Sequence, residues 1–285
     1  MNQVKEQVMK IVFLIAACTS VLAVALICIF LFANGIPAIG EIGVGKFLLG
    51  ELWRPSNNLY GILPMILGSI YVTAGAIILG VPVALFTSVF MARYCPKKIY
   101  PFLQSAINLM AGVPSVVYGF FGLVLIVPLI QSATGRDGST MLAASVLLAI
   151  MILPTIIGVT ESSLRSVPES YYEGSLALGA THERSIFFTI IPAAKSGIVA
   201  GIVLGIGRAV GETMAVIMVA GNQARMPAGL LRGVRTLTAN IVLEMGYAAD
   251  LHREALIATG VVLFVFILII NLAVSLLNRR THYGD

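Results

Sequence analysis

The stretch Ser196–Gly221, SGIVAGIVLGIGRAVGETMAVIMVAG, is long and apolar enough to cross a bilayer, yet it carries Arg208 and Glu212 near its middle. A charged side chain at membrane depth costs roughly 2.5–3.5 kcal/mol on insertion scales, so it usually faces a protein interior or a water-filled path. Viewed down a helix, an arc of roughly 80° holds both charged residues and three glycines, namely Gly197, Gly201 and Gly205. Gly211 borders this arc. Small residues at four-residue spacing let another helix approach closely, so these glycines predict a helix-packing face.

Two interpretations of the charged pair are open. An intrahelical ion pair between Arg208 and Glu212 would lock two packed helices together, although arginine before glutamate is the less favourable order. Alternatively, the pair marks a charged station on a transport path, and the glycine face is the surface along which this helix slides against its partner. We favour the transport path because little else in the chain offers chemistry.

The composition identifies a polytopic membrane protein. Charged residues make up 11% of the 285 residues, hydrophobic residues 58%, and the mean hydropathy is +0.97. The net charge of +5 comes without a basic cluster of the kind that follows a phosphate backbone, so we expect membrane lipid and no nucleic acid as a partner. The three cysteines have neither the spacing of a disulfide framework nor that of a metal site, which favours a packing role.

Six apolar regions predict an all-α fold with six transmembrane helices. Pro114 divides the third region, which predicts a short interfacial helix before the proline and a span after it. Six spans put both termini on one side, and the basic turn Arg93–Lys98 favours the cytoplasmic side. The predicted apolar regions are 11–32, 61–92, 102–130, 141–159, 196–221 and 255–277.

We expect an N-terminal transmembrane helix and external segment over residues 1–59, and a core of five transmembrane helices over residues 60–285. The only tryptophan, Trp53, favours a place in the aromatic belt at the membrane surface. The last outer loop carries arginines that are either solvated or close to an anionic path. These are Arg225, Arg232 and Arg235.

The polar segment 161–196 predicts two short helices in a cytoplasmic loop. Ser166 and Glu169 have the spacing of a capping box, Gly179 suits the end of the first helix, and Thr181 suits the cap of the second. Exposed apolar side chains on these helices indicate either a groove in a partner protein or the lipid surface. Acidic residues among them count against an anionic bilayer.

The sequence of this loop resembles the signature of a known protein family. The run Glu173–Gly179, followed by Ile191-Pro192, resembles the E-A-A-x-x-x-G…I-x-L-P signature of bacterial ABC importer permeases, with departures at Gly174, Ser175 and Thr189. The glutamate, the glycine six residues later and the proline keep the family's spacing. In that family the loop is the coupling helix that sits in a groove of the ATPase subunit. The resemblance therefore implies a coupling role for Glu173, Gly179, Ala180 and Pro192.

A narrower resemblance covers most of the chain. The segments FLFANGIPAI, WRPSNNLYGILPMILGSIYVT, AGVPSVVYGFFGLVLIVP and GIGRAVGETMAVIMVAGN are similar to PstC-type permeases of the phosphate-specific ABC importer. This similarity implies a type I ABC importer permease fold in the bacterial cytoplasmic membrane, with Arg208 and Glu212 on the substrate path. It also implies a PstA-type permease partner, a PstB-type ATPase dimer and an external PstS-type phosphate-binding protein. The chain itself is expected to hold no cofactor, because ATP and Mg belong to the ATPase.

Phosphate is compatible with the residues. Arginine presents a planar fork of donors that suits a tetrahedral oxyanion. Monohydrogen phosphate can donate its proton to a carboxylate, whereas sulfate has none at neutral pH. Glu212 would then hold Arg208 in place and penalise sulfate, or it would partly neutralise Arg208 so that phosphate is not trapped.

Other function classes are less well supported. Permeases for sulfate, molybdate or an amino acid are the nearest alternatives. A secondary transporter is disfavoured because we find no convincing internal repeat. The spans lack paired catalytic carboxylates or a nucleophile–base set, and the sequence has no G-x-x-x-x-G-K-[ST] motif, so neither a membrane-embedded enzyme nor a nucleotide site is expected.

Overall fold

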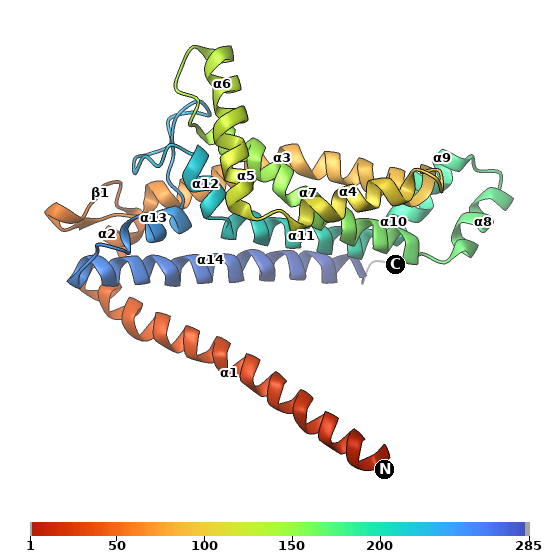
Figure 1. The fold of residues 1–285 in the computed structure, drawn as a ribbon, viewed down its shortest axis with the longest axis horizontal. Coiled ribbons are helices and arrows are strands. Elements are labelled where there is room, and N and C mark those ends of the chain that lie inside the picture. Colours follow the sequence, from red (N-terminus) through yellow and green to blue (C-terminus); the bar gives the residue numbers. More distant parts are fainter. Residues whose placement is uncertain (1, 283–285) are drawn as a thin grey trace.

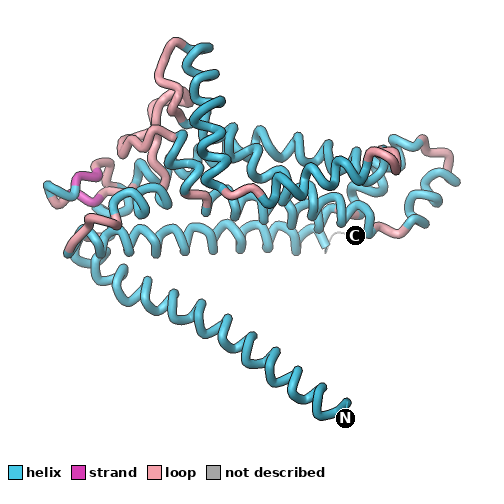
Figure 2. Tube along the Cα trace, viewed as in Figure 1, coloured by secondary structure: helices cyan, strands magenta, loops and turns pink. Residues whose placement is uncertain are grey.

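The computed structural model describes residues 2–282, with side chains over residues 5–273. It consists of helices and one small hairpin, in which β1 (Trp53–Arg54) pairs antiparallel with β2 (Leu59–Tyr60). Figure 2 shows that the loops gather mainly at the ends of long helices. The helices are α1 Asn2–Ile42, α2 Val44–Leu49, α3 Leu63–Val89, α4 Tyr100–Gly112, α5 Ser115–Phe121, α6 Val127–Thr134, α7 Met141–Ser166, α8 Glu169–Ala177, α9 His182–Ser185, α10 Ile191–Ala193, α11 Lys195–Gly211, α12 Met214–Val219, α13 Leu237–Glu244 and α14 Asp250–His282.

Five helical segments are long and apolar enough to cross a membrane, and the number is six if one bent pair counts as a span. The bent pair is the helical run His182–Ala193 followed by α11, with an angle of 69° between them. The predicted continuous helix over Ser196–Gly221 is wrong, because α11 ends at Gly211 and α12 begins at Met214. The predicted number of spans thus agrees with the fold, whereas the shape of the fifth does not.

The core of the bundle is built around α7. This helix lies between α3 and α11, and these helices run beside α14 along the long axis of the molecule (Figure 1). Glycines permit the close approach: a Cβ built on Gly80 of α3 would lie 3.0 Å from Ile152, and one built on Gly205 of α11 would lie 2.7 Å from Ile156. Small residues therefore allow α3 and α11 to pack tightly on α7.

Helix α4 is part of the bundle and does not lie across it as an interfacial helix would. Its Tyr100 hydroxyl donates to Glu161 Oε1 of α7 over 2.8 Å, and Leu103 and Ile107 pack against the main core. The helix ends before Pro114, where α5 and α6 continue at a steep angle to α7 (Figure 1). The prediction of a break at the proline is confirmed, but the predicted interfacial position is wrong because one face of α4 packs on α7.

One carboxylate joins four segments at the end of the bundle that carries the hairpin. Glu244, at the end of α13, is 7% exposed and accepts from Trp53 Nε1 at 2.8 Å, Arg235 Nη1 at 2.5 Å and His252 Nε2 at 2.9 Å. The predicted place of Trp53 in a lipid-facing aromatic belt is therefore wrong, since its indole is 6% exposed and its N–H needs a buried acceptor. Arg235 is likewise held inside the protein.

We predict that Glu244→Gln lowers the free energy of unfolding by about 3 kcal/mol, because it leaves the buried Arg235 cation without its counter-charge. Trp53→Phe removes only one hydrogen bond and should cost about 1 kcal/mol. Denaturation of the purified chain in detergent measures both effects. Glu254→Gln is the control, because Glu254 is exposed. Equal stability of Glu244→Gln and the control would contradict the prediction.

Candidate functional site at a helix break

The break between α11 and α12 brings extended backbone into an apolar region. Glu212 has φ −69° and ψ 131°, and Thr213 has φ −122° and ψ −59°, so neither residue is helical. Gly211 precedes the break, and glycine is a poor helix former. Non-helical backbone at membrane depth occurs only where it is buried in protein or lines a water-filled cavity. The break is therefore a candidate functional site.

Glu212 stabilises the break with its side chain and its main chain. Its Oε1 accepts from the backbone N–H of Ala215 at 3.1 Å, which caps the first turn of α12. Its carbonyl oxygen accepts from the Thr238 hydroxyl at 3.1 Å, at the beginning of α13. Sequence reasoning did not find Thr238, which is distant in the chain and has no motif around it.

Arg208 lies three residues before the end of α11 and is half-buried. Its Nη1 donates to the Thr155 hydroxyl of α7 at 3.1 Å. Within the side chains described, Arg208 has no carboxylate within 4.0 Å, so the intrahelical ion pair with Glu212, the less favoured of the two interpretations, is not formed. The physical reason is that Glu212 has left the helix, and the (i, i+4) geometry of a helix no longer applies.

A guanidinium group has five N–H donors. In the described chain, only the bond to Thr155 uses a donor of the Arg208 guanidinium, and the other donors are left for a ligand or water. Thr155 fixes one edge of the planar group, and its position after Pro154 in the middle of a span was a signal that sequence reasoning missed. The arrangement can bind an anion through charge-assisted hydrogen bonds.

Three of the four glycines predicted to pack helices lie against α7. Built Cβ atoms on Gly197 and Gly201 would meet Ser163 and Thr160, and one on Gly205 would meet Ile156. Nothing lies within 4 Å of a Cβ built on Gly211, so its predicted packing role is not observed within this chain. The first three glycines bring α11 against α7 and thereby place Arg208 beside Thr155.

The predicted coupling residues lie at the opposite end of α7 from the hairpin, in the loop that holds α8, α9 and α10. Gly179 has φ +85°, its N–H donates to Leu176 O at 2.9 Å, and the N–H of Ala180 donates to Ser175 O at 3.2 Å. These two bonds form a Schellman motif, which explains both the glycine and the residue after it. Glu173 is exposed on α8, and Pro192 lies within α10.

Other details of this loop differ from expectation. Residues 161–166 belong to α7, so the loop is shorter than the predicted segment 161–196. Ser166 donates to Ser163 O and does not cap α8, whose N-cap is Pro168, so the predicted capping box is wrong. The predicted cap at Thr181 is confirmed, because its hydroxyl accepts from Arg184 N at 3.3 Å.

The loop is tied to the bundle by Arg93, which lies in the π-helical turn Phe90–Tyr94 that follows α3. Its Nη1 donates to Glu169 Oε2 of α8 at 3.1 Å, and its Nη2 donates to Leu164 O of α7 at 3.0 Å. The Tyr172 hydroxyl of α8 lies 2.7 Å from His182 Nδ1 of α9. A displacement of α8 would therefore reach α3, α7 and the helical run that leads into α11.

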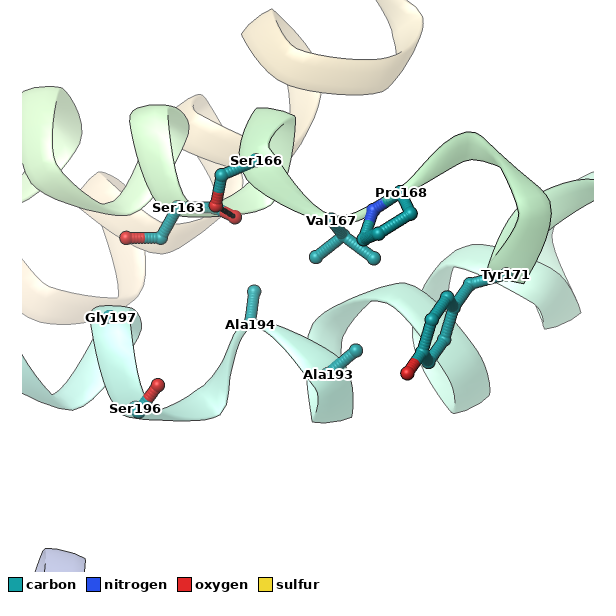
Figure 3. A pocket seen from close by; sticks show the side chains of 9 residues that line it. All are labelled: Ser163, Ser166, Val167, Pro168, Tyr171, Ala193, Ala194, Ser196 and Gly197. Atoms are coloured by element: carbon teal, nitrogen blue, oxygen red, sulfur yellow. Dashed lines mark hydrogen bonds between the residues drawn. The ribbon is translucent and has the colours of Figure 1, made fainter.

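A cavity of about 230 Å³ lies between the end of α7 and the beginning of α11 (Figure 3). Serines, alanines and one tyrosine make up most of its lining, and no charged side chain contributes to it. The serine hydroxyls can donate hydrogen bonds, but the cavity offers no cation to an anion. Arg208 remains the better candidate for a charged ligand.

Comparisons with known proteins give a consistent assignment. The model of the family described as "Binding-protein-dependent transport system inner membrane component" matches residues 80–283. The "Probable ABC transporter permease protein YqgH" of Bacillus subtilis is 36% identical over 276 residues, covering 94% of this chain and 89% of that protein. The "Phosphate transport system permease protein PstC" of Mesorhizobium japonicum is 33% identical over 275 residues, covering 89% and 84%.

Solved structures share the fold. An inward-facing structure of the MetNI methionine ABC transporter aligns with a TM-score of 0.63 at 20% identity, covering 81% of this chain and 99% of that one. A bacterial alginate ABC transporter in complex with its alginate-bound periplasmic protein aligns with a TM-score of 0.64 at 14% identity, covering 93% and 94%. The chain thus has the type I ABC importer permease fold, and it belongs to the family of inner membrane components of binding-protein-dependent transport systems.

Proposed function

We propose that this chain is the membrane-spanning subunit of an ATP-driven importer that carries inorganic phosphate across the bacterial cytoplasmic membrane. The observation that carries the proposal is Arg208, a half-buried guanidinium beside a break in a span, with one edge fixed by Thr155 and its other donors left for a ligand. Relatives named as PstC phosphate permeases, such as the one at 33% identity, favour phosphate over other oxyanions.

In the proposed path, Arg208 binds phosphate transiently through its planar fork of N–H donors. Partial burial strengthens this attraction, because the effective dielectric constant is lower than in bulk water. Glu212 has a different role, since one carboxylate oxygen already caps α12. The carboxylate can accept a hydrogen bond from the hydroxyl group of monohydrogen phosphate, and it repels sulfate, which has no hydroxyl group to donate.

We also propose the partners. A PstA-type permease completes the pore, two PstB-type ATPases bind ATP and Mg, and a PstS-type protein delivers phosphate from outside. Apolar side chains of α8 and the residue after it support the ATPase contact: Leu178 is 91% exposed and Tyr171 52% exposed. This chain translocates, and hydrolysis belongs to the partner.

The loop gives the ATPases a mechanical connection to the path. In this proposal, ATP binding moves α8, the contacts of Arg93 carry the motion to α3 and α7, and the 69° bend before α11 changes with it. A ligand shifts such an equilibrium only through its different affinity for the two states, so ATP and the docked binding protein must each prefer one.

The proposed contact between α8 and the ATPase also gives the orientation of the chain in the membrane. If α8 meets an ATPase, its end of the bundle is cytoplasmic. The described beginning of α1 and end of α14 both lie toward that end (Figure 1), which supports cytoplasmic termini. The hairpin β1–β2 and α13 are then external.

Arg208→Ala is expected to lower the initial rate of radiolabelled phosphate uptake at least about tenfold, because a hydrogen bond to a charged group contributes about 1.5–3 kcal/mol. Arg208→Lys keeps the charge without the fork and should restore part of the rate. The assay uses cells whose only copy of the chain is the variant. Arg54→Ala, an exposed arginine, is the control. Unchanged uptake by Arg208→Ala at a normal membrane level would contradict the role.

Glu212→Gln tests selectivity without removing the cap, because a glutamine oxygen can still accept from Ala215 N. We expect sulfate to compete more effectively against phosphate uptake, since the charge that repels sulfate is lost and the glutamine NH2 can donate to a sulfate oxygen. The measurement is the sulfate concentration that halves phosphate uptake, with Glu51→Gln as an exposed control. If that concentration is the same in both variants, Glu212 does not discriminate between the anions.

Leu178→Ser tests the coupling contact. The side chain is almost fully exposed, so the substitution should leave stability unchanged, but it removes apolar area from the proposed ATPase interface. We expect less ATPase subunit to co-purify with the tagged chain. Leu230→Ser, at an exposed leucine of the outer loop, is the matched control. Equal recovery of the ATPase in both variants would show that Leu178 lies outside the interface.

A further inference from the structure

Three arginines outside the Arg208 site line one hollow. Arg136 lies in the turn between α6 and α7, whereas Arg225 and Arg232 lie in the segment between α12 and α13. The hollow has a volume of about 250 Å³, and all three arginines are exposed. The remaining lining residues are Asp137, Ser139, Gln223, Leu231 and Gly233.

The charge of the hollow is not compensated by the protein. Three guanidinium groups face one carboxylate, Asp137, which leaves two positive charges in excess. No ion pair within 4.0 Å involves any of these three arginines across the side chains described. Arg235, in the same outer segment, differs because Glu244, Asn240 and the carbonyl of Asn222 occupy its donors. The three free arginines are therefore available to an external anion, and their summed field attracts one.

The backbone of the hollow is fixed by bonds between its two segments. Met141 N and Leu142 N donate to the carbonyls of Arg232 and Leu230, both at 2.9 Å. Val234 N donates to Ala220 O at 2.9 Å, which holds the return of the outer segment. The hollow therefore lies over the beginning of α7, whose first N–H groups are occupied by these carbonyls. The two segments hold their arginines in fixed relation without needing a ligand.

The hollow and Arg208 lie near opposite ends of one short helix. Helix α12 begins two residues after Glu212, and its six residues rise about 9 Å. The segment that carries Arg225 follows this helix, and α12 lies on the side of the molecule away from α8 (Figure 1). Helix α12 therefore separates the hollow from the helix break that Arg208 precedes.

We propose that this hollow is an outer anion site that holds inorganic phosphate before it reaches Arg208. The proposal rests on the function proposed above. The arginines supply donors for the phosphate oxygens, and Asp137 can accept a hydrogen bond from the hydroxyl group of monohydrogen phosphate. Since the arginines are exposed, the site binds weakly and is screened by salt. It therefore exchanges its anion quickly, which a transient binding site on a transport path requires.

The test measures radiolabelled inorganic phosphate binding to the assembled importer in lipid nanodiscs, without the external binding protein. All variants carry Arg208→Ala, so that only the outer site contributes. We expect saturable binding that weakens as salt is raised from about 50 to 200 mM. Arg225→Ala with Arg232→Ala should weaken it about tenfold, because two of the three cations that attract the anion are lost. Arg253→Ala is the matched control, since Arg253 is exposed but does not line the hollow.

Several outcomes would overturn the outer site. The first is that the Arg208→Ala importer shows no saturable binding of phosphate. The second is that the double variant and the Arg253→Ala control bind phosphate equally. The third is that the double variant binds phosphate normally but needs more external binding protein to stimulate the partner ATPase. The arginines would then form a docking surface for that protein. Phosphate uptake in cells separates the two proposals. If deletion of the chain leaves uptake unchanged, the proposed function fails. If deletion abolishes uptake but one of the outcomes above is observed, only the outer site is overturned.

Discussion

Backbone polar groups inside an apolar span need partners within the protein, and this requirement organises the region around Arg208. Breaking a span at Glu212 and Thr213 frees N–H and C=O groups that lipid cannot satisfy. The Glu212 carboxylate takes one N–H, and the Thr238 hydroxyl donates to one carbonyl. The break is thus possible only because α13 returns to the same place. Consequently, the segment between α12 and α13 supports the helix break and does not merely connect two helices.

Arginine serves three different purposes in this chain, and the distinction depends on burial and partners. Arg235 is surrounded by acceptors and joins external segments. Arg208 has one neutral partner, which orients the guanidinium without neutralising it. Arg225 and Arg232 are exposed and have no acidic partner among the described side chains. Only the last two environments leave positive charge for a mobile anion, so counting arginines in a loop says little until their neighbours are known.

Much of the fold was predictable because its causes are local. Apolar length predicted the spans, small residues at four-residue spacing predicted the face on which α11 meets α7, and Gly179 predicted a helix end. The helix break was not predicted, since glycine-rich spans can stay helical and Thr238 lies distant in sequence. Trp53 was misplaced for the same reason, because its partner Glu244 is 191 residues away. Of the site, Arg208 was found from its charge, whereas Thr155 was missed, because its position after Pro154 does not reveal that Arg208 of another helix is its partner.

The 191-residue separation between Trp53 and Glu244 also has a consequence for biogenesis. A membrane protein is inserted from its N-terminus as the ribosome makes it, so β1 is made long before α13 exists. During that interval the indole N–H has only water as a partner, and residues 43–62 lack the neighbours that bury them. The end of the subunit that carries the hairpin can therefore close only after nearly the whole chain has been inserted. Until then, one unclosed surface distinguishes an unfinished subunit from a finished one, and quality control in the membrane has a feature to recognise.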